Sequence, residues 1–469
     1  MSDNRSPARV LSRLRHSRNM LLLSQVSIVD LALLSDTEAA RLDFPETRAR
    51  KLAESLGVPD LPIASATAIF AAAERVIAAS DLRHEQRQNN HSSEPNLADG
   101  PRAGAEKVGT KPNEGSDHEI DGQKNEAQEL EDLRNVLEES GLSTRSIFTC
   151  IVNTAKIRSQ KSRSGLMLES LLLSAVAQFE VFISRMITIS LRYDPSTLAA
   201  SDKKYTFDEI SIHDSLVSFT DAASDSYVDS LMYEGMQSWM RFLAKATRTN
   251  TEWVSDSLEE VVMRRNVHVH AGGRASVKYI AALGKKAAAV KVGDDLPVTA
   301  AYLNDALDRM AQAAIVLTQA ALAAVCASAR VRNGAEAGPS LQPEMGLVDA
   351  SFDLLAAGRF ACVAPLASQL EPYVTTAATR ERLRANSLLA KKKQDGINAV
   401  RSEIESWDVS AAEDQLVLAK HCLLDEVDEA RMVYERLSNL GEITVAELAT
   451  WPILETLRTS FADESGDAE

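Results

Sequence analysis

Aromatic residues are scarce in this chain of 469 residues, where Phe, Trp and Tyr together make up 5%. Sheet-rich domains rely on aromatic and β-branched residues, so this shortage disfavours a β fold. Alanine and leucine are abundant instead, and the hydrophobic and charged contents, 45% and 25%, are those of a globular protein. The composition therefore predicts an all-α protein, and the length predicts about two to four domains.

Cysteine is also rare. The four cysteines, Cys150, Cys326, Cys362 and Cys422, are far apart and none has metal-ligand spacing. We expect buried free thiols in a reducing compartment and no zinc site. The sequence also lacks the glycine patterns of phosphate-binding loops, which disfavours an ATP-driven role. We therefore expect no cofactor and no bound metal ion.

Positive charge is in deficit, with a net charge of −16. This balance disfavours sequence-blind nucleic-acid binding by the whole surface, because phosphates would be repelled, but it leaves room for a small basic pocket. The lysine run at residues 391–393 is interpreted as a solvated helix surface rather than an RNA contact.

Long hydrophobic runs are few. The N-terminus is basic and then apolar, but its apolar run is short, is broken by Ser24 and Gln25, and has no A-x-A cleavage site, so we do not expect export. Residues 310–328 carry no charge, yet they are mostly alanine, with Gln312 and Gln319 at helical spacing. This pattern predicts a buried bundle helix rather than a membrane span, and hence a cytoplasmic protein without a membrane partner.

Hydrophobic periodicity divides the chain into four segments. Residues 1–80 predict a small helical module of unassigned role. Residues 81–126 are rich in Gly, Pro, Asn and charge, and predict a disordered linker. Residues 127–335 predict a helical bundle, and residues 345–469 contain helix pairs that resemble tetratricopeptide repeats.

The candidate chemistry is concentrated in residues 264–273, RRNVHVHAGG. The two glycines predict the end of a helix, because glycine relieves the left-handed C-terminal turn. Asn266 and His270 are four positions apart and share a face of that helix. Arg265 and His270 lie about 140° apart around it, so they meet only if the last turn distorts or Arg265 reaches round.

These residue types fit chemistry on phosphate. Arginine offers a permanent forked charge, and histidine can give or take a proton. A helix C-terminus stabilises imidazolium. The set fits metal-independent RNA cleavage, in which the substrate 2′-hydroxyl attacks its own phosphate. The alternative is an ordinary polar helix end, where basic residues and histidine only complement the helix dipole.

The stretch from residue 260 to 273, EVVMRRNVHVHAGG, resembles the signature of the HEPN superfamily: an arginine, a short spacer that often begins with asparagine, then a histidine. Those positions are Arg265, Asn266 and His270. FEVF at 179–182 is similar to the first HEPN helix, and residues 206–239, 407–430 and 449–458 resemble other parts of a bacterial HEPN-plus-repeat architecture. The resemblance covers about residues 140–460.

The resemblance implies metal-independent RNA cleavage by a homodimer, in which paired motif helices bring two arginines and two histidines to one composite site. Such proteins act as toxins in abortive infection and other anti-phage systems. Carried over to this chain, Arg265 supplies charge to the phosphate, Asn266 positions it, and His270 is the acid or base.

Three further residues are accessory candidates. Arg264 would assist with charge, and His268 is interpreted as a packing residue or a phosphate contact. Glu180 would orient Arg265, or it is a plain surface charge. The repeat tail would bind a protein partner.

Two other interpretations stay open. Some HEPN domains have lost catalysis, so the bundle would then be an inactive scaffold for dimerisation and interaction. A third reading is an antitoxin or regulator whose acidic surface masks a basic partner.

Overall fold

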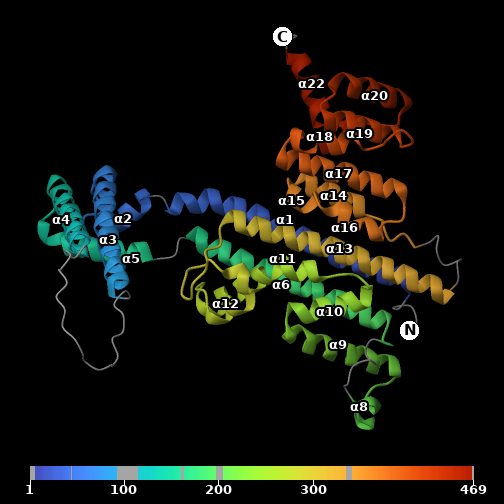
Figure 1. Ribbon diagram of the computed structural model, residues 1–469, viewed down its shortest axis with the longest axis horizontal. Coiled ribbons are helices and arrows are strands. Elements are labelled where there is room, and N and C mark those ends of the chain that lie inside the picture. Colours follow the sequence, from blue (N-terminus) through green and yellow to red (C-terminus); the bar gives the residue numbers. More distant parts are fainter. Residues whose placement is uncertain are drawn as a thin grey trace, which may run out of the picture. The chain divides into compact units, whose positions relative to one another are not determined.

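The computed structural model describes residues 6–43, 45–91, 115–159, 163–196, 204–333 and 341–466. These residues are mostly helical (Figure 1). Among them, one isolated antiparallel bridge joins Arg274 to Asp295. The predicted all-α class is therefore confirmed. The α-helices are α1 (Pro7–Asp43), α2 (Pro45–Ser55), α3 (Ile63–His91), α4 (Gly115–Glu139), α5 (Ile147–Ser159), α6 (Arg163–Tyr193), α8 (Phe207–Ser211), α9 (Leu216–Glu234), α10 (Met236–Thr247), α11 (Glu252–Ala271), α12 (Val277–Leu283), α13 (Ala300–Asn333), α14 (Leu347–Ala356), α15 (Phe360–Val363), α16 (Leu366–Leu370), α17 (Ala377–Asp395), α18 (Ile397–Glu405), α19 (Asp414–Leu424), α20 (Val427–Leu440), α21 (Val445–Thr450) and α22 (Glu455–Gly466).

The chain forms two compact units. The small unit is Leu33–Met167, and the large unit combines Met1–Ala32 with Leu168–Glu469. This division differs from the expected one. Helices α4 and α5 belong with the N-terminal helices α2 and α3, whereas the bundle and the tail share one unit.

The interval predicted as a disordered linker, residues 81–126, is helical at both ends. Helix α3 continues to His91 and α4 begins at Gly115. The rest of the predicted linker, residues 92–114, lies outside the described residues.

The small unit has its own core, built by α2 to α5. On α3, Ala66, Ile69, Ala73 and Val76 are buried at the three- and four-residue spacing of one helix face. This face packs with buried side chains of the other three helices, among them Leu52, Leu133 and Cys150.

Helix α13 lies between two cores of the large unit. Its Met310 and Leu317 belong to the bundle core, which α1, α6, α9, α10 and α11 complete. Its Ile315 and Val316 belong to the core of the tail. Burial against both cores accounts for the uncharged run that the sequence places here.

The two glutamines of α13 face the tail. Gln312 donates a hydrogen bond to Oε1 of Gln369 at 2.8 Å, and Gln319 donates to the carbonyl oxygen of Tyr373 at 3.2 Å. Hydrogen bonding offsets the cost of burying these amides.

Three helical stretches are long and apolar enough to cross a membrane by length and composition: Ile63–Asp81, Ser164–Tyr193 and Ala300–Val331. In the last of these, 78% of the most apolar window is buried within the protein.

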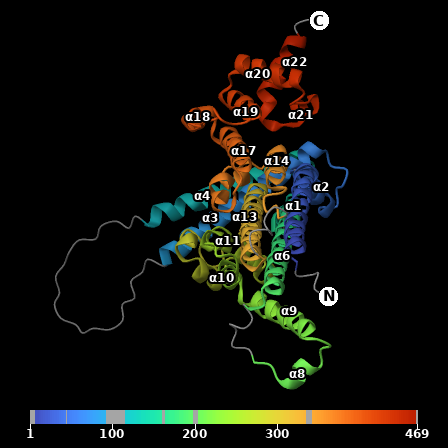
Figure 2. The same ribbon diagram turned by 90° about the vertical axis from the view of Figure 1, so that its right-hand side faces the viewer.

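The tail is built from α14 to α22, which follow one another away from α13 (Figures 1 and 2). Helices α17 and α18 pack as one consecutive pair, and α19 and α20 as the next. The lysine run is tied into this tail, because each lysine has an acidic partner at 2.6–2.8 Å: Lys391 with Glu403, Lys392 with Asp425, and Lys393 with Glu455. These ion pairs favour a structural role for the run.

All four cysteines are buried and free, as expected. Burial raises the pKa of Cys150 to about 11 and that of Cys422 to about 12. Thiols of this kind are poorly reactive, because the thiolate is the nucleophile.

Candidate functional site

The motif lies on the last two turns of α11. The helix ends at Gly272, which has a φ of 62°, and the backbone N–H of Gly272 donates to the carbonyl oxygen of Val267. Helical geometry continues through Ala271, so the last turn is not distorted. Arg265 and His270 therefore remain on different sides of α11.

Arg265 is anchored to the long helix α6. Its Nη2 donates to Oε1 of Glu180, and its Nη1 donates to Oδ1 of Asn266 at 3.1 Å. The Arg265 and Glu180 side chains are 20% and 24% exposed, so the pair lies at the surface but is largely desolvated. Burial raises the pKa of the Glu180 carboxyl, and the charge of Arg265 opposes that rise.

Arg264 is held by a different cluster. Its Nε lies 2.7 Å from Oε1 of Glu260, its Nη1 donates to the carbonyl oxygen of Pro297, and its guanidinium lies 4.1 Å from the ring centroid of Tyr302. Glu260 also accepts hydrogen bonds from the hydroxyls of Tyr279, at 2.8 Å, and Tyr302, at 2.7 Å. Arg264 thus joins α11 to the segment that follows it.

The two histidines of the motif differ sharply in exposure. The His268 side chain is 3% exposed, with Nε2 2.9 Å from the carbonyl oxygen of Leu296 and Nδ1 3.5 Å from Glu169. His270 is exposed at the end of α11. The contacts of His268 favour packing, whereas His270 is open to a ligand.

Several residues of this region were missed by the sequence analysis. Glu260 precedes Arg264 by four positions, a spacing that signals an intrahelical ion pair. Tyr279, Tyr302 and Glu169 reach the motif from other helices, and no local pattern points to them. Together these four residues contact Arg264, His268 or each other and hold the end of α11 in place.

The chemistry open to this surface is charge stabilisation and proton transfer, through Arg265 and His270. Within the described ranges, no group of His, Cys, Asp or Glu side chains is arranged to hold a metal ion.

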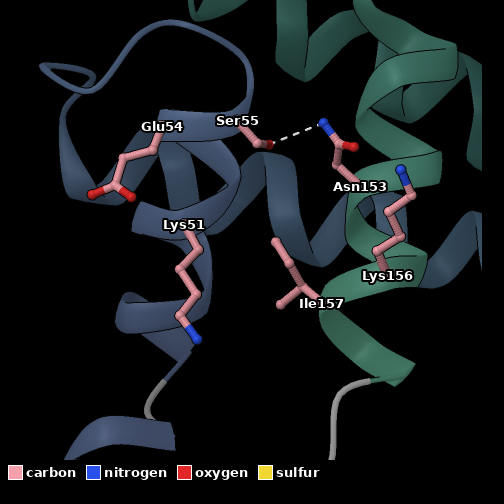
Figure 3. Close-up of a pocket in the computed structure, with 6 residues that line it drawn as sticks. All are labelled: Lys51, Glu54, Ser55, Asn153, Lys156 and Ile157. Carbon is pink, nitrogen blue, oxygen red and sulfur yellow. Dashed lines mark hydrogen bonds between the residues drawn. The ribbon is translucent and has the colours of Figure 1, made fainter.

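A separate hollow lies in the small unit, between α2 and α5 (Figure 3). There the amide of Asn153 donates to Oγ of Ser55 at 3.0 Å. Two lysines, Lys51 and Lys156, and the oppositely charged Glu54 also line it. Nothing in this mixed surface specifies a ligand.

Comparison of the chain with protein-family models, with curated proteins and with solved structures finds no match. The resemblance to the HEPN signature therefore stays a prediction made from the sequence alone.

Proposed function

We propose that this chain is a metal-independent endoribonuclease of HEPN type, a cytoplasmic toxin or anti-phage effector that acts as a homodimer. The observation that supports it is the arrangement on α11: Arg265 is fixed by Glu180 of α6, and His270 is exposed at the end of the same helix. A fixed positive charge and an accessible imidazole are the two groups that phosphodiester cleavage needs.

The reaction would be an internal transesterification. The 2′-oxygen of the RNA attacks the neighbouring phosphorus as its proton passes to one imidazole. A second, protonated imidazole gives its proton to the leaving 5′-oxygen. The products are a 2′,3′-cyclic phosphate and a 5′-hydroxyl, and Arg265 stabilises the charge that builds on the phosphate oxygens.

The geometry of α11 supports a dimer for this reaction. One chain supplies a single His270, whereas the reaction uses a base and an acid. Within one chain, Arg265 and His270 also point about 140° apart around the helix. Two copies of α11 facing each other would bring one chain's arginine to the other chain's histidine.

Asn266 would keep the Arg265 guanidinium in place through its side-chain oxygen. Arg264 and His268, both engaged by protein groups, would support the helix rather than the phosphate. The net charge of −16 favours a selected RNA over general RNA degradation.

The test is cleavage of labelled total RNA and tRNA in EDTA. We expect cleavage that leaves 2′,3′-cyclic phosphate ends and falls at least about 100-fold in Arg265→Ala and His270→Ala, as for loss of a charge-stabilising or acid–base group. Matched controls are Arg134→Ala and His16→Ala, which alter exposed side chains outside the motif. Cleavage that needs a metal ion, or that survives in both motif variants, would contradict the proposal.

A second candidate is an inactive HEPN-like scaffold, which is favoured by the engagement of Arg265 with Glu180 and Asn266. Both candidates are dimers, so the cleavage assay separates them, and analytical ultracentrifugation of the same samples shows that the chain tested is a folded dimer. A folded dimer without cleavage, and without growth arrest on expression, would assign the scaffold function.

A further inference from the structure

The segment that follows the motif helix, residues 272–299, has the opposite charge balance from the rest of the chain. It contains five cations and two aspartates, whereas the whole chain has a net charge of −16. All five cationic residues are exposed: Arg274, Lys278, Lys285, Lys286 and Lys291. We call residues 272–299 the basic segment. A local excess of positive charge on an acidic protein directs a polyanion to that one part of its surface.

The basic segment is folded onto the end of α11. Tyr279 and Leu283 of α12 share a small buried core with Val267 of α11. The backbone closes the segment as well, because the N–H of Leu296 donates to the carbonyl oxygen of Gly273 at 2.8 Å. The cations are therefore carried by a packed structure that is continuous with the motif helix.

The contacts of the basic segment place its cations along α11, beginning at the end that carries His270. Helix α12 packs against α11 (Figure 1). Arg274, four positions after His270, pairs with Asp295 at 3.3 Å, so both ends of the basic segment meet beside the last turn of α11. Lys286 reaches back to Asp256, near the start of α11, at 3.3 Å. The basic segment thus extends along most of the motif helix.

Three of the five cations have no acidic partner. Arg274 and Lys286 are paired with carboxylates, whereas Lys278, Lys285 and Lys291 form no ion pair within the described ranges. The second aspartate, Asp294, accepts a hydrogen bond from the backbone N–H of Lys291 at 2.7 Å. Exposed lysines without a carboxylate are available to phosphate groups, and binding there releases the counterions of a nucleic acid.

The basic segment offers charge without a surface for reading bases. All of its residues are described, and its one aromatic side chain, Tyr279, is only 2% exposed. Its large exposed apolar side chains are Val277 and Val292, which are too small to stack on a base. Aromatic side chains provide the stacking in single-strand binding, so contact here would be with the phosphate backbone.

We propose that the basic segment binds the phosphate backbone of single-stranded RNA, through Lys278, Lys285 and Lys291, and leads it to His270. The choice of RNA as the polyanion rests on the ribonuclease proposal. A single strand is required because the 2′-oxygen must turn into line with the leaving 5′-oxygen, which a base-paired helix restricts. Phosphate contacts position a strand without reading its sequence, so any selection of the RNA target would come from another part of the chain.

The test is fluorescence anisotropy of a labelled single-stranded RNA of mixed sequence, with the full chain carrying His270→Ala so that the RNA stays intact. In that background, the combined changes Lys278→Gln, Lys285→Gln and Lys291→Gln should weaken binding at least about 10-fold at about 100 mM salt. They should also lower the slope of log Kd against log salt by about 2, because each phosphate contact on a single strand contributes about 0.7.

The matched control replaces three exposed lysines outside the basic segment, with Lys51→Gln, Lys204→Gln and Lys245→Gln. It changes the net charge by the same amount and should leave affinity and salt slope within about 2-fold of the parent. Equal losses in the two triple variants would mean that net charge alone is responsible, and would overturn the proposal. So would an unchanged Kd in the basic-segment variant.

The outcome is separable from that of the ribonuclease proposal. RNA binding that depends on the basic segment, in a chain that does not cleave RNA, would support this inference and contradict the ribonuclease. Cleavage that continues at full rate with all three lysines replaced would do the reverse. A chain that binds no RNA, and whose sedimentation changes when the lysines are replaced, would assign the segment to contact with an acidic protein surface and overturn the proposal.

Discussion

A single carboxylate, that of Glu260, connects the motif helix to two other helices. It accepts from Tyr279 of α12 and Tyr302 of α13 while it pairs with Arg264 beside it on α11. Burial, together with the bond to Glu260, raises the pKa of Tyr279 to about 12, and burial also raises the pKa of Tyr302. Both hydroxyls therefore stay protonated, as donors, well above neutral pH.

This cluster predicts a loss of stability in alkali. A tyrosine whose pKa is higher in the folded state stabilises the fold fully below its unfolded pKa of about 10, and that contribution is lost as the pH rises from about 10 toward 12. We expect Tyr279→Phe to lower the free energy of unfolding by about 1–2 kcal/mol at pH 8, and to make its decline above pH 10 shallower. Urea unfolding across this range checks both effects.

The control for that experiment is Tyr233→Phe, at a tyrosine that is 92% exposed. Its stability and pH dependence should match those of the unaltered chain. A Tyr279→Phe variant with an unchanged alkaline slope would show that the Glu260 cluster does not control this loss.

At the same scale, the sequence predicted some residues of the candidate site but not all of their contacts. Arg265, Asn266 and His270 were found because they are close in sequence and chemically distinctive. The link from Arg265 to Glu180 spans 85 positions. The sequence analysis offered this contact as one of two interpretations of Glu180, and no spacing rule could decide between them. Tyr302 is 42 positions from Glu260 and has no local signal at all.

At the scale of the element, the end of α11 depends on Gly272, whose φ of 62° is unfavourable for residues with a side chain. We expect Gly272→Ala to destabilise the large unit by about 1 kcal/mol, and Gly272→Asn by less, because asparagine tolerates this conformation better. No atom lies within 4 Å of the position that a new Cβ would take, so any loss reflects backbone strain rather than collision. Thermal unfolding of the two variants gives the comparison, and equal stability of all three chains would contradict it.

Helices α13 and α4 show what hydrophobic periodicity can and cannot predict about a helix. The uncharged, glutamine-marked pattern of α13 predicted a buried helix, and it is buried against two cores. Helix α4 was not predicted as one element: its first part falls in the expected linker, residues 81–126, and the rest in the expected bundle, whereas α4 belongs to the small unit. A hydrophobic face predicts that a helix packs against another element, but it does not identify that element.

At the scale of the whole molecule, two units with separate cores should unfold separately. Phe70 is 3% exposed in the core of the small unit. We expect Phe70→Ala to cost about 3–5 kcal/mol in the transition of the small unit only, because residues that share no core or partner act independently. Differential scanning calorimetry would show one transition shifted and the other in place.

The control is Phe207→Ala, at a phenylalanine of the large unit that is 82% exposed, and it should change neither transition by more than about 0.5 kcal/mol. If Phe70→Ala lowers both transitions together, the units unfold as one.

The burial of all four thiols leaves the surface without a reactive sulfur. A single Val269→Cys change, at a side chain that is 50% exposed beside His270, would then be the only site open to a spin label. Electron–electron distance measurements on that one label would report how close two copies of α11 approach, without removing any native cysteine. The native chain therefore allows a distance to be measured at the proposed composite site with a single substitution.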